Sequence, residues 1–265
     1  MMARPRPVLR LLIAALIAAP ILAAAPAAAE RLVASLSMHR VLITSNFTGA
    51  ELVLFGTVER DAQTIARRGG YDLVATVSGP RQTMVTRRKE RVFGIWVNTE
   101  SRTFIEVPSY LATLATRPLE QVTNPEALRR LQLGLANTVL PQKIGIDIAD
   151  TVQDDPFRSA FLRLKMDHQL YVEGPNAVTF LTPTLFRASI PLPAEVPVGA
   201  YDVDVKLFAD GAMIARTNSA FEIVKVGFEQ FIVTAASGYG LFYGIATAAM
   251  ALMTGWLASV AFRKD

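Results

Sequence analysis

The side chains that most often carry enzyme chemistry are scarce in this sequence. It contains no cysteine and two histidines, His39 and His168. The lack of cysteine excludes disulfides, thiol nucleophiles, Cys-ligated zinc and iron–sulfur clusters. The two histidines are too far apart in the sequence for an H-x-x-x-H metal pattern. We expect His39 to lie in a turn between two strands and His168 to pack at the end of a helix.

Other catalytic motifs are missing as well. The sequence has no G-x-S-x-G or S-x-x-K motif and no glycine-rich phosphate loop. An acidic stretch carries Asp147, Asp150, Asp154 and Asp155, but its spacing differs from that of a calcium-binding EF-hand, so helix capping explains it better. We predict no catalytic residue, no metal site and no cofactor. An enzyme would instead need a deep polar pocket that joins a histidine to carboxylates.

One segment has the composition of an anion-binding site. The candidate residues are Arg87, Arg88, Lys89 and Arg91. Glu90 is the one acid among them, and the guanidinium group matches oxyanion geometry. The ligand would be a small oxyanion or a lipid headgroup, with Trp96 close by in the strand expected over 92–97. The alternative is an exposed strand edge protected from aggregation by charge, with Trp96 in the core.

The N-terminus has the features of a secretory signal peptide over residues 1–29. Arg4, Arg6 and Arg10 precede a short apolar stretch, and small residues lead to a cleavage site between Ala29 and Glu30. An uncleaved signal anchor is the alternative. Loss of the three arginines would reduce the net charge from +4 to about +1. Because nucleic-acid binding requires many cationic contacts, we predict no nucleic-acid partner.

The C-terminus predicts one transmembrane helix over residues 238–262. No charged residue occurs between Glu229 and Arg263, and the stretch is long enough to cross a bilayer. The positive-inside rule assigns the tail, residues 263–265, to the cytoplasm. We therefore expect a single-pass protein of the inner (cell) membrane with its body in the periplasm.

Small residues follow one face of this predicted helix. They are Gly240, Gly244, Ala248, Ala251, Gly255 and Ser259. Small side chains let helix backbones approach closely in lipid, so this face would pack against a polytopic transporter or a second copy of the chain. Alternatively, the pattern reflects the abundance of alanine and glycine in membrane spans.

The body is predicted to be mainly β, with immunoglobulin-like β-sandwich architecture. Short strands rich in β-branched residues give an N-terminal sandwich over 30–107, with strands expected at 84–85, 92–97 and 103–107. Helix-start signals predict a helical connecting segment over 108–170, with one amphipathic helix from Pro156 to about His168. Strands return in a second β unit over 171–228, which includes an Asp210-Gly211 hairpin turn. The pattern does not decide whether the strands form one composite β domain or two.

Three ordered sequence blocks resemble the alphaproteobacterial putative transmembrane protein family. The blocks are the basic segment with Gly94 to Asn98, the stretches 196–201 and 207–211, and Lys225 to Glu229. The resemblance covers essentially the whole mature chain and implies no catalytic residue. Members of the family are often encoded beside exporters of the sulfite/organosulfonate (TauE-like) type, which implies an accessory role in anion export.

These observations together predict a non-enzymatic, single-pass periplasmic protein that is accessory to an anion exporter. The expected partners are membrane lipid and a polytopic transporter or a second copy. The alternative is a self-associating structural or envelope protein that has no small-molecule ligand.

Overall fold

The computed structural model describes residues 30–60, 70–144, 147–150, 155–227 and 239–261. The predicted signal peptide and the tail 263–265 lie outside these ranges, as do Asp154 and residues 238 and 262 of the predicted span. The predictions made for those residues therefore stay predictions.

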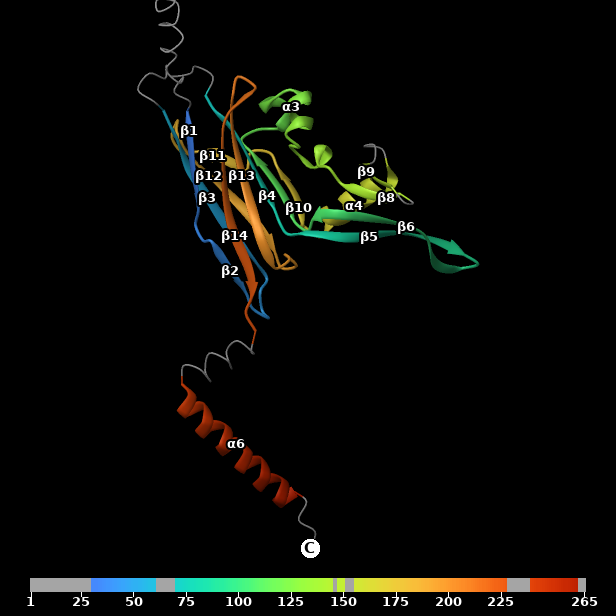
Figure 1. The fold of residues 1–265 in the computed structure, drawn as a ribbon, viewed down its shortest axis with the longest axis vertical. Coiled ribbons are helices and arrows are strands. Elements are labelled where there is room, and N and C mark those ends of the chain that lie inside the picture. The colour runs from blue at the N-terminus through green and yellow to red at the C-terminus, as the bar shows by residue number, and fades with distance from the viewer. Residues whose placement is uncertain (1–29, 61–69, 145–146, 151–154, 228–238, 262–265) are drawn as a thin grey trace, which may run out of the picture.

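The body is a β-sandwich of two sheets, with a third sheet beside it (Figure 1). The first sheet has the order β1 (Arg31–Leu36), β3 (Gly49–Glu59), β12 (Leu185–Pro193) and β11 (Val178–Phe180). The second has the order β10 (Tyr171–Gly174), β7 (Leu111–Ala115), β4 (Asp72–Ser78), β13 (Gly199–Ala209), β14 (Ala212–Lys225) and β2 (Arg40–Ile43). The third has the order β5 (Arg81–Val92), β6 (Ile95–Pro108), β8 (Pro141–Ile144) and β9 (Asp147–Asp150).

The main core lies between the first two sheets. Alternate residues of β3 and β12, such as Leu52, Leu54 and Ile190, are fully buried and share one cluster with Val203 and Val205 of β13. This alternation is what a strand with one covered face requires, because successive side chains point to opposite faces. Burial of these apolar side chains is the main source of stability for a chain without disulfides.

The N-terminal and C-terminal strands form one composite sandwich, which answers the question that the sequence left open. β12 pairs with β3 from Leu185↔Thr57 to Pro193↔Gly49, and β13 pairs with β4. The stretches 30–107 and 171–228 are therefore not two separate β units. The sheets are packed as a sandwich, while the immunoglobulin-like topology stays a prediction.

The connecting segment 108–170 contains the predicted helices but also three strands. Its helices are α2 (Leu119–Val122), α3 (Pro125–Arg130), the 3-10 turn η1 (Leu135–Asn137) and α4 (Pro156–Asp167). The Asn124 and Asp155 side chains accept hydrogen bonds from the amides of Ala127 and Arg158, at 2.8 and 3.0 Å, which confirms both helix starts. β7, β8 and β9 were not expected. All five residues of β7 are buried, so the strand lacks the alternation by which a strand is recognised.

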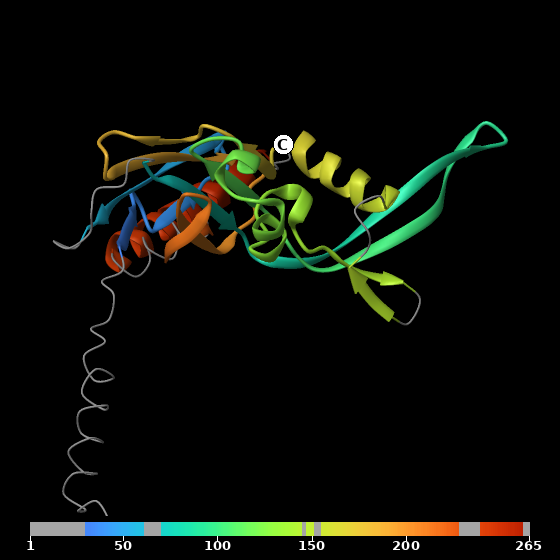
Figure 2. The ribbon, with the colours of Figure 1, turned by 90° about the horizontal axis from the view of Figure 1, so that it is seen from above.

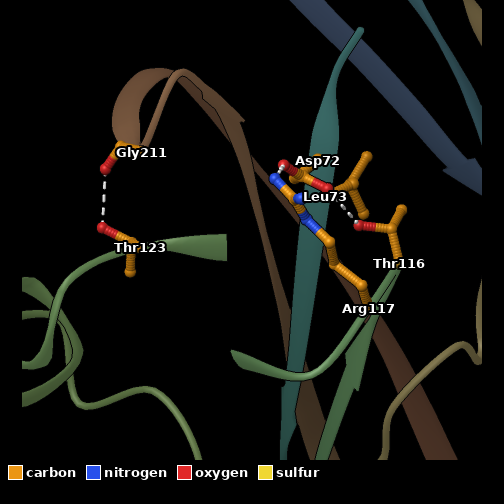
Figure 3. Close-up of polar contacts among 6 residues, drawn as sticks. All are labelled: Asp72, Leu73, Thr116, Arg117, Thr123 and Gly211. Atoms are coloured by element: carbon orange, nitrogen blue, oxygen red, sulfur yellow. Dashed lines mark hydrogen bonds and ion pairs between the residues drawn. The ribbon is translucent and has the colours of Figure 1, made fainter. Parts of the chain in front are cut away.

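Polar contacts fasten the start of this segment to the second sheet (Figure 3). Arg117 forms an ion pair with Asp72, whose other carboxylate oxygen accepts a hydrogen bond from the Thr116 hydroxyl at 3.1 Å. The Thr123 hydroxyl donates to the Gly211 carbonyl at 2.6 Å. These contacts hold α2 and α3 at the end of the sheet where β13 turns into β14.

β5 and β6 form a long hairpin, which we call the arm, that projects away from the sandwich (Figures 1 and 2). The separate strands expected at 84–85 and 103–107 are parts of this hairpin, and the strand expected over 92–97 is interrupted by its turn. Phe93 and Gly94 both have positive φ, 49° and 85°, as a two-residue turn of this kind requires. Glycine is the only sequence signal for that turn, because phenylalanine rarely adopts such a φ.

Candidate functional site

The pairing of β5 with β6 distributes the charges of the arm between its two faces. Residues two apart on a strand share a face, and paired residues on the two strands share it too. Arg91 pairs with Trp96 and Lys89 with Asn98, and Arg87 shares their face. The four predicted anion-binding residues therefore do not share one face, because Arg88 lies on the opposite face from the other three.

The first face, which we call the basic face, carries Arg87, Lys89, Arg91 and Trp96. All four side chains are exposed, and Trp96 is 67% accessible, so the expectation that Trp96 lies in the core is wrong. Within the described part of the chain, none of the three cations forms an ion pair. The one described side-chain hydrogen bond that these cations make runs from Arg91 Nε to the Gly94 carbonyl at 3.4 Å. These cations are therefore available to an anion from outside the chain.

The opposite face of the distal arm carries one cation and two acids, a net charge of −1. Arg88 forms ion pairs with Glu90 at 2.9 Å and Glu100 at 3.8 Å. Both acids of the distal arm therefore pair with Arg88, the one cation on this face, and neither neutralises the basic face. At the end of the arm this second face carries Val92, Ile95 and Val97, all of them exposed.

The base of the arm is held in an aromatic cluster under α4. The Phe161 ring stacks on Phe104 of β6 with ring centroids 4.4 Å apart and meets Tyr171 edge-on at 5.8 Å. The buried Tyr171 hydroxyl donates to the Pro108 carbonyl at 2.7 Å, and burial raises its pKa. Lys165 of α4 donates to the Ser109 carbonyl at 3.0 Å. The distal ribbon thus projects from a packed base (Figure 2).

Asp155 links α4 to the third sheet. Its carboxylate accepts hydrogen bonds from Gln142 Nε2 at 2.8 Å and from the Arg158 amide. Burial alone would raise the pKa of Asp155, but these hydrogen bonds outweigh it and lower the pKa below its ordinary value. The residue acts as the predicted helix cap.

A polar groove on the outer face of the second sheet was missed from the sequence. It is a cavity of about 700 Å³ whose charged lining consists of Arg81, Arg130, Asp202, Asp204, Lys206 and Arg216. In its lining, the Asp204 carboxylate accepts hydrogen bonds from Arg216 Nε at 2.6 Å and from the buried Lys206. Asp204 is the main reason that the pKa of Arg216 is raised. The polar alternation Asp202, Asp204, Lys206 is the signal by which this face could have been found.

Neither histidine lies in this groove. His39 is exposed in a bend before β2. His168 is the C-cap of α4, and its Nδ1 lies 2.9 Å from Glu195 in an exposed pair rather than in a packed site. Among the described residues, no group of three or more His, Asp or Glu side chains is arranged to hold a metal.

The C-terminal helix α6 (Gly240–Ala261) is separate from the body and mostly exposed (Figure 1). Of the predicted packing residues, Gly240, Gly244, Ala248, Ala251, Gly255 and Ser259 all lie in α6 and are exposed. A Cβ atom added at any of the three glycines would meet no other atom within 4 Å. In the described ranges, no helix has both the length and the apolar character needed to cross a bilayer.

Comparison with known proteins agrees with the resemblance carried by the three sequence blocks. No curated protein and no solved structure matches the chain. The profile of the family described as "Putative transmembrane protein (Alph_Pro_TM)" matches residues 31–264, which is nearly all of the body together with α6. The chain therefore belongs to the Alph_Pro_TM family of putative transmembrane proteins.

Proposed function

We propose that this protein is a non-enzymatic, single-pass accessory protein whose β-sandwich stands outside the cytoplasm and presents the arm to a partner surface. The observation that carries the proposal is the combination of an uncharged C-terminal helix with an arm whose exposed end serves no purpose in the core. Both features favour a role in which the protein contacts a surface outside its own chain.

The anchor is supported by the composition of α6. The described helix has 22 residues, and none of them is charged. The proposed span, 238–262, extends past the described part of this helix at both ends. Leu241, Leu252 and Met253 are each more than 60% accessible, and lipid would cover these side chains. The family description, which names a transmembrane protein, agrees.

The orientation is supported by the two ends of the chain. A signal peptide over 1–29 would export the body, and Arg263 and Lys264 would stay in the cytoplasm under the positive-inside rule. This arrangement gives an inner-membrane protein whose body lies in the periplasm.

The accessory role is supported by the open face of α6. Because a Cβ at Gly244 or Gly255 would meet nothing in the described chain, a second helix has room to approach there. We propose a polytopic partner, an exporter of sulfite-type anions. A second copy of the chain is the alternative, which would make the protein a self-associating envelope component with no small-molecule ligand.

Two measurements test the anchor and its orientation. The full chain should float with membranes after carbonate extraction. A reporter fused after Asp265 should be found in the cytoplasm and not in the periplasm. A chain that stays soluble, or a reporter that is active in the periplasm, would refute the proposed topology.

Co-purification in mild detergent tests the partner. Gly244→Leu and Gly255→Leu should reduce recovery of the partner severalfold, because leucine prevents close helix approach. Ala246→Leu and Ala249→Leu are matched controls, since at 100° per residue they lie on the other side of α6. Equal recovery from all four variants would refute docking through this face. Crosslinks between identical chains alone would favour self-association.

A further inference from the structure

We propose that the basic face of the arm docks on an anionic bilayer surface, with Arg87, Lys89 and Arg91 on the lipid headgroups and Trp96 in the interface. The inference rests on the proposed function in one respect, because α6 must hold the body at a membrane. It adds a second contact between the protein and the membrane, at the end of the chain's most prominent projection (Figure 2).

The first argument is charge complementarity. Arg87, Lys89 and Arg91 share one face, and both nearby acids pair with Arg88 on the other face. A surface of three cations without a carboxylate fits a sheet of negative charge better than it fits a mixed protein surface. Long basic side chains also keep their charge at headgroup level while their stems lie along apolar surface.

The second argument is the aromatic character at the end of the arm. Trp96 lies directly across from Arg91, and Phe93 at the turn is fully accessible. Tryptophan favours the interface between headgroups and hydrocarbon. Phe93 also adopts φ 49°, a region that is costly for an aromatic residue and easy for asparagine or glycine. A phenyl ring at that position is explained if the ring itself enters an apolar layer.

The third argument is the place from which the arm leaves the sandwich. β4 ends at Ser78, which pairs with Asp202, and Asp202 pairs with Ala220 of β14. The base of the arm is therefore level with Ala220, five residues before the end of β14 at Lys225. Five residues of strand cover about 16 Å. Because β14 is the last strand before α6, the arm emerges from the half of the sandwich nearer the proposed membrane (Figure 1).

This geometry brings the arm within reach of the bilayer. Nine residue steps lead from Met84 to Phe93 at the turn, so the free part of the arm extends about 30 Å. If the arm tilts by about 30° toward the proposed membrane, its end is lowered by about those 16 Å, to the level at which β14 ends. The fourteen residues between β14 and α6 limit the remaining distance to about 50 Å even when fully extended. The docked and undocked positions can therefore both occur in one anchored chain.

Trp96 itself provides the measurement. The sequence has two tryptophans, Trp96 and Trp256, so the full chain with Trp256→Phe has Trp96 as its single tryptophan. This chain is reconstituted in vesicles of phosphatidylcholine alone or with about one third phosphatidylglycerol, in each case with and without brominated lipid. We expect a blue-shifted emission that brominated lipid quenches in the anionic vesicles, and emission typical of water in the neutral ones.

Charge variants test which face docks. Each cation near an anionic surface changes the ratio of docked to undocked arm about fivefold, so Arg87→Gln, Lys89→Gln and Arg91→Gln together should lower this ratio roughly a hundredfold. Salt at about 0.5 M should act in the same direction. The control is the double variant Arg129→Gln and Arg130→Gln, on the exposed face of α3, which should leave quenching unchanged. It is compared with the double variant Lys89→Gln and Arg91→Gln, which removes the same number of charges from the basic face.

Each outcome has a distinct meaning. Trp96 emission that stays water-like in anionic vesicles, in a chain that floats with them, overturns the arm inference and leaves the anchor intact. A chain that does not float refutes the proposed function instead. A shift that follows the protein-to-lipid ratio rather than the anionic fraction overturns lipid docking in favour of contact between two copies.

Discussion

Asp204→Asn should destabilise the sandwich far more than its position on an outer sheet face suggests. Lys206 has a side chain that is 6% accessible, and Asp204, at 21%, is its counter-ion. Removal of one partner from a buried ion pair costs about 3–5 kcal/mol, because the other charge is left unpaired away from water. Since Asp204 is partly exposed and asparagine can still accept a hydrogen bond, we expect about 2–3 kcal/mol. The corresponding fall in melting temperature is roughly 5–10 °C.

A double variant separates loss of the counter-ion from loss of packing. Lys206→Met alone should change the free energy of unfolding by less than about 1 kcal/mol, because Asp204 keeps its two hydrogen bonds from Arg216, at 2.6 and 3.1 Å. Asp204→Asn combined with Lys206→Met should recover most of the loss, because no buried cation then lacks a partner. The measurement is urea unfolding of the full chain in detergent, followed by circular dichroism of the strands.

Asp202→Asn is the matched control, because Asp202 lies on the same strand and the same face but is exposed. Its effect should stay within about 0.5 kcal/mol. The reasoning is wrong if Asp204→Asn and Asp202→Asn have equal effects, or if the double variant is no more stable than Asp204→Asn alone.

Three further predictions concern α4 and the arm. Phe161→Ala should cost about 3–5 kcal/mol by urea unfolding, because the ring is buried between Phe104 and Tyr171. Asp155→Ala should cost about 1 kcal/mol. The lowered pKa of Asp155 means that its contribution is complete above its unfolded pKa, near 4, and is lost as pH falls through the folded value, so the variant and the parent should converge in acid. Phe93→Asn should slow amide hydrogen exchange in the distal arm severalfold by relieving the positive φ, and faster exchange would refute the strain argument.

Local sequence signals predicted local structure well. The Asn124-Pro125 and Asp155-Pro156 pairs correctly start α3 and α4, and Asp210-Gly211 is the predicted hairpin turn, with φ of 51° and 81°. A cap or a tight turn is decided by three or four neighbouring residues, so its signal is complete in the sequence.

Features that depend on distant pairing were not visible in the sequence. β12 joins β3 across more than a hundred residues, and no local pattern encodes that choice. β7 lies between β10 and β4 in the second sheet with every residue buried, so its sequence resembles a buried helix as much as a strand. The arm was divided into pieces because its turn has phenylalanine where asparagine or aspartate is usual.

The candidate site shows the same division between what is local and what is not. The basic segment and Trp96 were recognised from composition, but their distribution between two faces depends on the register of β5 with β6. That register includes a shift between Arg88 and Lys89, beyond which Arg88 lies opposite Glu100. The shift gives Arg88 an acid across the ribbon, while Arg87, Lys89 and Arg91 keep neutral neighbours there. A one-residue change in the register would exchange these surroundings.

The attachment of the arm bears directly on what its exposed end can do. A two-stranded ribbon alone is marginally stable in water, and ordering it on binding would cost conformational entropy. Here the proximal half is already ordered by the Phe104–Phe161 stack and by the hydrogen bond from Tyr171 to Pro108. The distal half then needs little further ordering, so three cations and one tryptophan can be enough for a reversible contact. The aromatic cluster under α4 is therefore part of the binding device, although it lies far from the end of the arm.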